Sequence, residues 1–151
     1  MSENISIILC TYNEVNFISK TYKKIKEVLP KAEIVIIDDN SNDGTVNVLK
    51  QIEGKGDTKI VYRKKARGLA SAFIRGLMET TRSHVGWIDT NMSELTDRFP
   101  EMNDILIGET DIVILSRYVE NGDDKRDFLR VFCSKYINIL CGVILSKKIK
   151  D

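Results

Sequence analysis

The chain has 151 residues, 42% hydrophobic and 30% charged, a composition typical of one globular domain with a single core. Its 23 basic and 22 acidic residues leave a formal net charge of +1. This balance argues against a dedicated nucleic-acid binder, which presents a strongly basic face. A single histidine excludes a two-histidine metal site. Three cysteines without metal-type spacing favour a reduced, cytoplasmic setting over a disulfide framework.

Short runs rich in Ile and Val alternate with helix-type runs along the chain. The predicted buried strands are Ile5–Cys10, Ile34–Asp38, Lys59–Tyr62, Val85–Asp89 and Asp111–Leu115. Strands that alternate with helices in this way indicate an α/β fold, with a mostly parallel sheet flanked by helices on both faces.

Helices are predicted between these strands from the spacing of apolar residues. The stripe from Val15 to Leu29 recurs at three- and four-residue intervals and predicts a helix that Pro30 ends. A second helix is predicted from Asp43 or Gly44 to about Ile52, and a third presents one apolar face over residues 69–77. A fourth begins near Pro100, because proline suits the first helical turn.

The pattern changes after the fifth predicted strand. Residues 120–127 are polar and predict a loop, and a mostly apolar helix is predicted from about Phe128 to Leu145, followed by Lys147, Lys148 and Lys150. Two interpretations stay open. The helix lies on an anionic membrane surface, or it packs on the sheet and its basic tail is solvated.

Polar side chains follow four of the predicted strands, in Cys10–Glu14, Asp38–Thr45, Asp89–Ser93 and Ser116–Tyr118. In an open parallel sheet, ligands bind beyond the carboxyl ends of the strands. The sequence therefore predicts that these four segments meet at one ligand-binding edge.

The residue types at that edge suit a phosphorylated ligand and a hard cation. Asp89 is the best candidate ligand for Mg²⁺ or Mn²⁺, which bind one or two carboxylates together with substrate phosphates. Asp38 and Asp39 form a carboxylate pair that suits ribose hydroxyls or a base edge. Arg117 offers a planar fork for phosphate. Gly68 opens a helix beside a basic run and presents backbone N–H groups that suit a diphosphate.

Each of these features also has a structural interpretation. Asp43 is expected to be a helix N-cap rather than a ligand, and Asp38 to hold its own loop. The basic run Arg63–Arg67 is usually a solvated face. His84 is expected to open a strand rather than act as a catalytic base.

Other α/β enzyme classes lack their signatures here. The turn after the first strand is Thr-Tyr-Asn-Glu and contains no glycine, which excludes a dinucleotide-binding turn and disfavours a nucleotidyltransferase. The sequence also contains neither a phosphate-binding Gly-rich loop with Lys-Ser/Thr nor a Gly-x-Ser-x-Gly nucleophile motif.

Two segments, Ser6–Glu14 (SIILCTYNE) and Ile36–Thr45 (IIDDNSNDGT), resemble the opening of family 2 glycosyltransferases with the GT-A fold. Gly68–Gly76, Ser116–Val119 and Arg130-x-x-x-Ser134 look like the dolichyl-phosphate (polyprenyl-phosphate) mannosyltransferase branch. The resemblance covers residues 1–151 as a single domain. It implies a nucleotide-sugar-binding part over residues 1–119 and, over 120–151, a loop and amphipathic helix toward the acceptor and the membrane.

The resemblance implies an inverting transfer of a hexose from GDP-mannose, or from a UDP-hexose, to a polyprenyl phosphate at the cytosolic membrane face. A lipid phosphate is already anionic near neutral pH, so the nucleophile needs positioning rather than a histidine base. The implied donor-binding residues are Cys10, Tyr12, Glu14, Ile37 and Asp39, with Gly68 at the diphosphate. Asp89 and Asn91 are the implied ligands of a divalent metal, Mg²⁺ or Mn²⁺. Arg117, Arg130 and Ser134 face the acceptor phosphate, and Asp89, Arg117 and Arg130 are the implied catalytic residues.

Three departures from the family pattern matter. Asn91 stands where the family has the second aspartate of Asp-x-Asp, and Cys10 stands where it usually has proline. The family also continues beyond the position of Asp151, so we expect about the donor-binding two-thirds of a catalytic domain. Such a chain is a truncated enzyme, is completed by a second chain, or is a binding module without full catalysis. An unfinished sheet also predicts self-association through its exposed edge.

Overall fold

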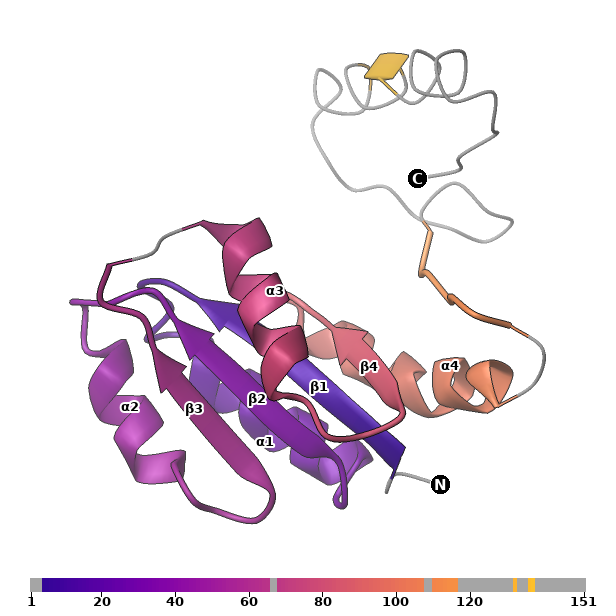
Figure 1. Cartoon of the computed structure of the whole chain (residues 1–151), viewed down its shortest axis with the longest axis horizontal. Coiled ribbons are helices and arrows are strands. Elements are labelled where there is room, and N and C mark those ends of the chain that lie inside the picture. Colours follow the sequence, from indigo (N-terminus) through magenta and orange to yellow (C-terminus); the bar gives the residue numbers. More distant parts are fainter. Residues whose placement is uncertain (1–3, 66–67, 108–109, 117–131, 133–135, 138–151) are drawn as a thin grey trace. The chain divides into compact units, whose positions relative to one another are not determined.

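The computed structural model describes residues 4–65, 68–107, 110–116, 132 and 136–137. The chain divides into two compact units, Met1–Ile112 and Val113–Asp151. The sheet and its labelled helices belong to the first unit (Figure 1). The predicted functional subdivision at residue 119 stays a prediction.

Four strands form the sheet of the first unit: β1 (Ile5–Thr11), β2 (Glu33–Asp38), β3 (Thr58–Tyr62) and β4 (His84–Trp87). They lie in the order β3-β2-β1-β4, and every pairing is parallel. Both central strands are buried almost throughout, because each has a neighbour on both sides and helices over both faces. The predicted α/β fold with a parallel sheet is confirmed.

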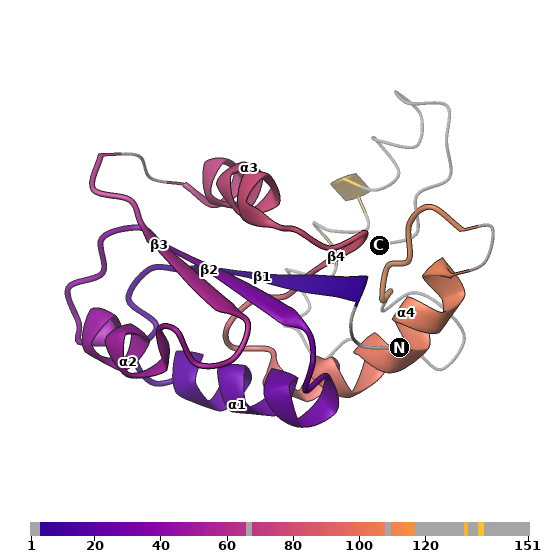
Figure 2. The same cartoon turned by 60° about the horizontal axis from the view of Figure 1, so that its bottom comes forward.

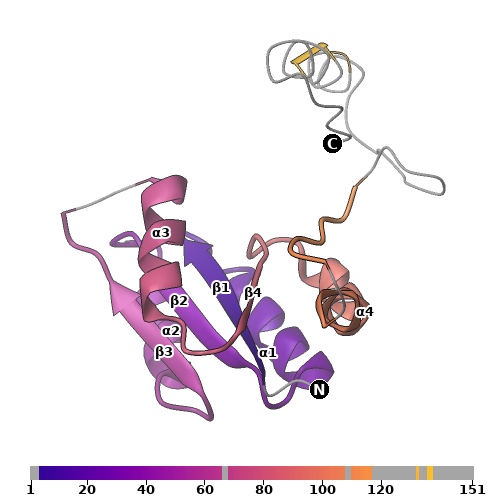
Figure 3. The same ribbon diagram turned by 45° about the vertical axis from the view of Figure 1, so that its right-hand side comes forward.

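The helices lie on opposite faces of this sheet. Figure 2 shows α1 (Ile18–Val28), α2 (Thr45–Ile52) and α4 (Phe99–Leu106) on one side and α3 (Leu69–Glu79) on the other. Figure 3 shows α3 lying across the middle of the sheet. The larger core cluster lies on the α1 side. A smaller one, of Val35, Ile37 and Ala72, lies under α3.

The helix boundaries follow the sequence signals closely. In α1, Ile18, Tyr22 and Ile25 are buried, which is the predicted stripe. Before α2, the N-cap is Gly44, with a φ of 104°, rather than the predicted Asp43. Asp43 lies one position earlier, and its carboxylate accepts the Thr45 N–H at 2.9 Å. It therefore still provides a hydrogen-bond acceptor for a backbone N–H in the first turn of the helix.

A glycine lets α3 approach the sheet closely. A Cβ atom at Gly76 would lie 2.6 Å from Cγ2 of Ile8, well inside van der Waals contact. Ile8 is fully buried in β1. The missing side chain at position 76 therefore allows the close approach of α3 to β1.

The fifth predicted strand, Asp111–Leu115, is wrong. Residues 111–116 have no regular secondary structure, and Ile112 and Ile114 are 74% and 71% exposed. Alternating isoleucine and valine indicates an apolar segment that suits a strand, but a strand also needs a neighbour to pair with. Among the described residues none pairs with this segment.

Most of the predicted helix Phe128–Leu145 lies outside the described residues. Its three described positions, Phe132, Tyr136 and Ile137, are helical and each more than half exposed. Across the part of the chain that the structure describes, no helix is both long enough and apolar enough to span a bilayer.

Candidate active site

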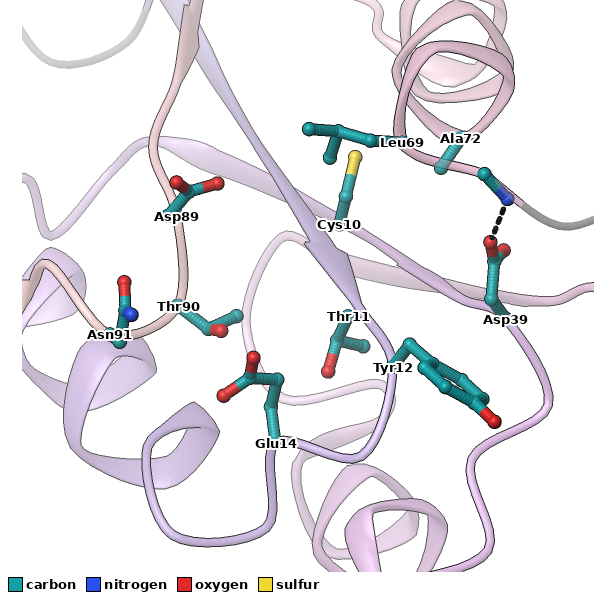
Figure 4. Close-up of a pocket in the computed structure, with 11 residues that line it drawn as sticks. Cys10, Thr11, Tyr12, Glu14, Asp39, Leu69, Ala72, Asp89, Thr90 and Asn91 are labelled. Atoms are coloured by element: carbon teal, nitrogen blue, oxygen red, sulfur yellow. Dashed lines mark hydrogen bonds between the residues drawn. The ribbon is translucent and has the colours of Figure 1, made fainter. Parts of the chain in front are cut away.

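A pocket of about 450 Å³ opens at the carboxyl edge of the sheet. It is lined by the end of β1, the loops after β2 and β4, and the start of α3 (Figure 4). The lining residues are Cys10, Thr11, Tyr12, Glu14, Asp39, Gly68, Leu69, Ala72, Asp89, Thr90 and Asn91. Three of the four predicted strand-end segments therefore converge, as expected for an open parallel sheet.

Two of the loops around the pocket are joined by side-chain hydrogen bonds to backbone N–H groups. Ser41 Oγ accepts the Asn13 N–H at 2.9 Å, and Asn13 Oδ1 accepts the Asn42 N–H at 2.9 Å. Thr45 Oγ1 accepts the Glu14 N–H at 2.9 Å. Asn13 has a φ of 59°, a left-handed conformation that asparagine tolerates better than most residues. This network fixes Tyr12 and Glu14 at the pocket.

Asp38 is a structural residue, as expected. It is fully buried, and its carboxylate accepts the N–H of Ser41 at 3.0 Å and the Ser41 hydroxyl at 2.5 Å. Both bonds lie within its own loop. Asp38 therefore shapes the loop, and of the two neighbouring carboxylates only Asp39 lines the pocket.

Asp39 forms a buried ion pair with Arg63. The carboxylate accepts two guanidinium bonds of 2.6 and 2.7 Å, and Asp39 Oδ2 also accepts the Gly68 N–H at 2.9 Å, dashed in Figure 4. Asp39 therefore already holds the Gly68 N–H, and the binding of a diphosphate at this helix start stays a prediction. Arg63 is only 8% exposed, so it is not part of a solvated basic face.

The sequence analysis missed the role of Arg63, although the signal was present. Strands β2 and β3 are parallel, and Asp38 pairs with Tyr62 in their register. The residues one step further along, Asp39 and Arg63, must then be neighbours at the strand ends. Residues of opposite charge at equal positions after two adjacent parallel strands are the sequence pattern that predicts this ion pair.

The loop after β4 carries the predicted metal ligands. The Met92 N–H donates to the Asp89 carbonyl at 3.0 Å, which closes a four-residue turn with Thr90 and Asn91 at its corner. In the view of Figure 4, Asp89, Asn91 and Glu14 lie on one side of the pocket, and Asp39 and Ala72 on the other. The pocket therefore has an acidic side and a side built on the start of α3.

The chemistry of Cys10 is set by its surroundings. Burial raises the pKa of its thiol from 9.0 to about 11, with smaller contributions from the charges of Asp39 and Asp89. Thiolates are the nucleophilic form of cysteine. Cys10 is consequently a neutral, half-buried wall of the pocket and not a nucleophile.

The remaining predicted residues divide into two groups. Ile37 is fully buried against Val35 and Ala72, so it lies beneath the pocket and is not among the residues that line it. His84 opens β4, as expected, with its Nδ1 3.1 Å from Oδ1 of Asn103. Arg117, Arg130 and Ser134 lie outside the described residues.

With this geometry in hand, comparison with known proteins identifies the family. Residues 6–146 match the glycosyl transferase family 2 domain. The chain belongs to glycosyl transferase family 2. The β1 and β2 motifs, which carried the resemblance, build the pocket of this family 2 domain together with the Asp89 turn.

Curated and solved relatives agree with that assignment. The chain is 32% identical over 150 residues to a dolichol-phosphate mannosyltransferase of Pyrococcus furiosus, covering 97% of this chain and 42% of that protein. It thus spans less than half the length of this relative. A mannosyltransferase of Pyrobaculum calidifontis, solved with GDP-Man and Mn²⁺, shares 28% identity over 58% of this chain and 27% of its own, with a TM-score of 0.52.

A second solved structure supports the GT-A fold alone. S. aureus TarS in complex with UDP-GlcNAc superimposes with a TM-score of 0.59 at 18% identity, over 78% of this chain and 38% of its own. At this level of identity the likeness concerns the fold and not the chemistry of the site.

The oxygen atoms of the pocket suit a divalent cation. Asp89 supplies a carboxylate and Asn91 an amide oxygen, both hard ligands that Mg²⁺ and Mn²⁺ accept. Among the described residues, no three Cys, His, Asp or Glu side chains group closely enough to hold a metal on their own. The Asp89 and Asn91 oxygens fit an ion that shares its coordination with ligand phosphates.

Proposed function

We propose that this domain binds GDP-mannose and transfers its mannose to a polyprenyl or dolichyl phosphate, with inversion at the anomeric carbon. The observation that carries the proposal is that Tyr12, Glu14, Asp39 and the Asp89 turn line one pocket, although the chain separates them widely. The Pyrococcus furiosus relative, a dolichol-phosphate mannosyltransferase, supports the choice of sugar and acceptor. The Mn²⁺ and GDP-Man complex of the Pyrobaculum calidifontis enzyme supports the donor.

The two sides of the pocket suit the two ends of a nucleotide sugar. On one side, the Asp39–Arg63 pair offers a polar wall and Leu69 and Ala72 at the start of α3 an apolar one for the nucleoside, beside Cys10 and Tyr12. On the other, Asp89 and Asn91 face the position of the diphosphate. The Asp89 carboxylate at that position would repel an anionic diphosphate unless a cation lay between the two. This charge arrangement favours a metal-dependent donor site.

A bound Mg²⁺ or Mn²⁺ would offset the charge that develops on the departing diphosphate. The protein's own part is to hold the sugar and the lipid phosphate in line, since the phosphate nucleophile already carries its charge. We propose that Arg117, Arg130 and Ser134 bind the acceptor phosphate. Contact with the cytosolic face of a membrane through the basic Lys147, Lys148 and Lys150 is part of the same proposal.

The direct test is transfer of labelled mannose from GDP-mannose to a polyprenyl phosphate in the presence of Mn²⁺. We expect a lipid-soluble labelled product, and we expect Asp89→Asn to reduce it to background because the only carboxylate of the turn is lost. Asp97→Asn, an exposed carboxylate outside the pocket, is the matched control. A wild-type chain that makes no product from any nucleotide sugar, although it binds one, would contradict transfer by this chain.

A second function is favoured by Asn91. A neutral amide at this position carries one negative charge less than a second aspartate, which weakens attraction for a cation. The alternative is a nucleotide-sugar-binding or partner module with impaired catalysis. Asn91→Asp distinguishes the two. A large gain in Mn²⁺ affinity and transfer favours a decayed site, and unchanged values favour a working variant.

A further inference from the structure

The turn that carries Asp89 and Asn91 is held from beneath by a residue outside the pocket. Thr90 is the corner residue between them and is only 3% exposed. Its carbonyl accepts a hydrogen bond from the hydroxyl of Thr21, a fully buried residue of α1 that is 69 positions away in the chain.

The direction of the Thr21 hydroxyl is informative. A threonine within a helix commonly returns its hydroxyl to the carbonyl four residues earlier, which here belongs to Phe17. Thr21 instead donates to Thr90, on another element. A buried carbonyl without a partner is costly, so this bond fixes the orientation of the peptide that links Thr90 to Asn91.

Other links between α1 and the segment after the turn are weaker. Lys20 contacts Glu94 at 2.6 Å and Lys24 contacts Asp97 at 3.0 Å, but the Lys20 and Glu94 side chains are 66% and 71% exposed. Exposed ion pairs contribute little because water and salt screen them. These pairs attach η2 (Ser93–Arg98) to the surface of α1, whereas the buried Thr21 bond acts on the turn itself.

We propose that Thr21 is a positioning residue for the metal-binding turn. Through the Thr90 carbonyl it sets the direction in which Asp89 and Asn91 enter the pocket, while it does not line the pocket itself. Residues that orient metal ligands from outside the coordination sphere raise affinity by holding the ligands ready. The inference rests on the proposed function, because it concerns the same metal site.

Three variants test it in the complete chain. Thr21→Val keeps the shape and removes the hydroxyl, Thr21→Ser keeps the hydroxyl, and Thr96→Val is the matched control. Thr96 is also fully buried, and its hydroxyl donates to the Ser93 carbonyl at 2.6 Å, within η2. Thr96→Val therefore removes a comparable buried bond that does not reach Thr90.

The measurement is Mn²⁺ affinity with GDP present, followed by electron paramagnetic resonance, alongside the thermal midpoint. We expect Thr21→Val to weaken Mn²⁺ binding about 10–100-fold, the range for lost orienting partners of metal ligands. Thr21→Ser and Thr96→Val should bind Mn²⁺ like wild type, although Thr96→Val lowers the midpoint about as much as Thr21→Val.

Two results would overturn the inference and leave the proposed function standing. One is a wild-type Mn²⁺ affinity in Thr21→Val, and the other is a loss of Mn²⁺ affinity in Thr96→Val equal to that in Thr21→Val. If Thr21→Val does not fold, Thr21→Ser becomes the test. A tenfold loss of Mn²⁺ affinity in Thr21→Ser would overturn the inference, because it would show that packing and not the hydroxyl positions the turn. A wild-type chain that binds no Mn²⁺ with GDP would overturn both proposals.

Discussion

Asp39 and Arg63 form the most enclosed ion pair among the described residues, with side chains 9% and 8% exposed. We expect Arg63→Met to destabilise the fold by about 3–5 kcal/mol, because it leaves a buried carboxylate without its counter-charge. Urea unfolding measures this. Arg75→Met breaks the more exposed Arg75–Glu79 pair and should cost no more than about 1 kcal/mol. Equal losses in the two variants would contradict the structural role of the Arg63 pair.

The raised pKa of Cys10 makes a prediction about stability and pH. Between pH 9 and 11 the unfolded thiol, with its ordinary pKa of 9.0, loses its proton, while the folded thiol, with a pKa of about 11, keeps it. The unfolded state then binds fewer protons, so the free energy of unfolding falls as the pH rises through this window. We expect a Cys10→Ser variant to show a shallower decline than wild type in urea unfolding at pH 8, 9 and 10. If the free energy of unfolding falls equally with pH in wild type and Cys10→Ser, the raised pKa of Cys10 is contradicted.

Single residues show both the reach and the limits of prediction from the sequence. Tyr12, Glu14, Asp39 and Asp89 were placed at one pocket from strand ends and motifs, because parallel topology brings strand ends together whatever the side chains do. The Asp39–Arg63 ion pair depends on the register between β2 and β3, which the periodicity of apolar residues alone does not predict. The Thr21 bond joins residues whose proximity arises only from the packing of α1 under the turn.

At the scale of elements, α3 depends on a glycine. We expect Gly76→Ala to destabilise the protein, because overpacking of a core costs about 1–3 kcal/mol and exceeds the gain of about 0.8–1.0 kcal/mol in helix propensity. The would-be Cβ lies 2.6 Å from Cγ2 of Ile8. In an Ile8→Ala background, which removes that atom, the same substitution should be neutral or stabilising. A double-mutant cycle by urea unfolding measures the coupling, and additive effects would contradict the close approach.

The elements themselves were largely predictable, and the exception is instructive. Four strands and the helices between them follow from apolar periodicity and from Pro30, Gly44 and Pro100. The segment Asp111–Leu115 has the same composition as a strand yet is unpaired and exposed among the described residues. Composition reports what a segment prefers, whereas pairing depends on whether a neighbouring strand is available.

At the scale of the whole molecule, apolar side chains gather on the outer surface of α3 and at the end of β4. Ile74, Met78 and Trp87 are 52%, 76% and 44% exposed, and β4 pairs only with β1 in the described sheet. Exposed apolar surface and open sheet edges promote association. We expect the mass from light scattering to rise with protein concentration, and the double variant Ile74→Lys/Met78→Lys to suppress the rise.

The control for that prediction is Asn47→Lys, which adds a positive charge at an exposed position of α2. It should leave association unchanged. If wild type stays monomeric at high concentration, or if Asn47→Lys suppresses association as strongly as the α3 variant, the apolar surface is not the cause.

The measurement that tests the central claim most directly is thermal unfolding with GDP, GDP-mannose, UDP and UDP-glucose, each with Mn²⁺ and with a chelator. A ligand at about a hundredfold its Kd adds about 2.7 kcal/mol, enough to raise the midpoint by several degrees in a chain of this size. We predict a rise with the guanine nucleotides that requires Mn²⁺ and is lost in Asp89→Asn. No rise with any nucleotide, or the same rise with the chelator, would contradict a metal-dependent donor site at Asp89.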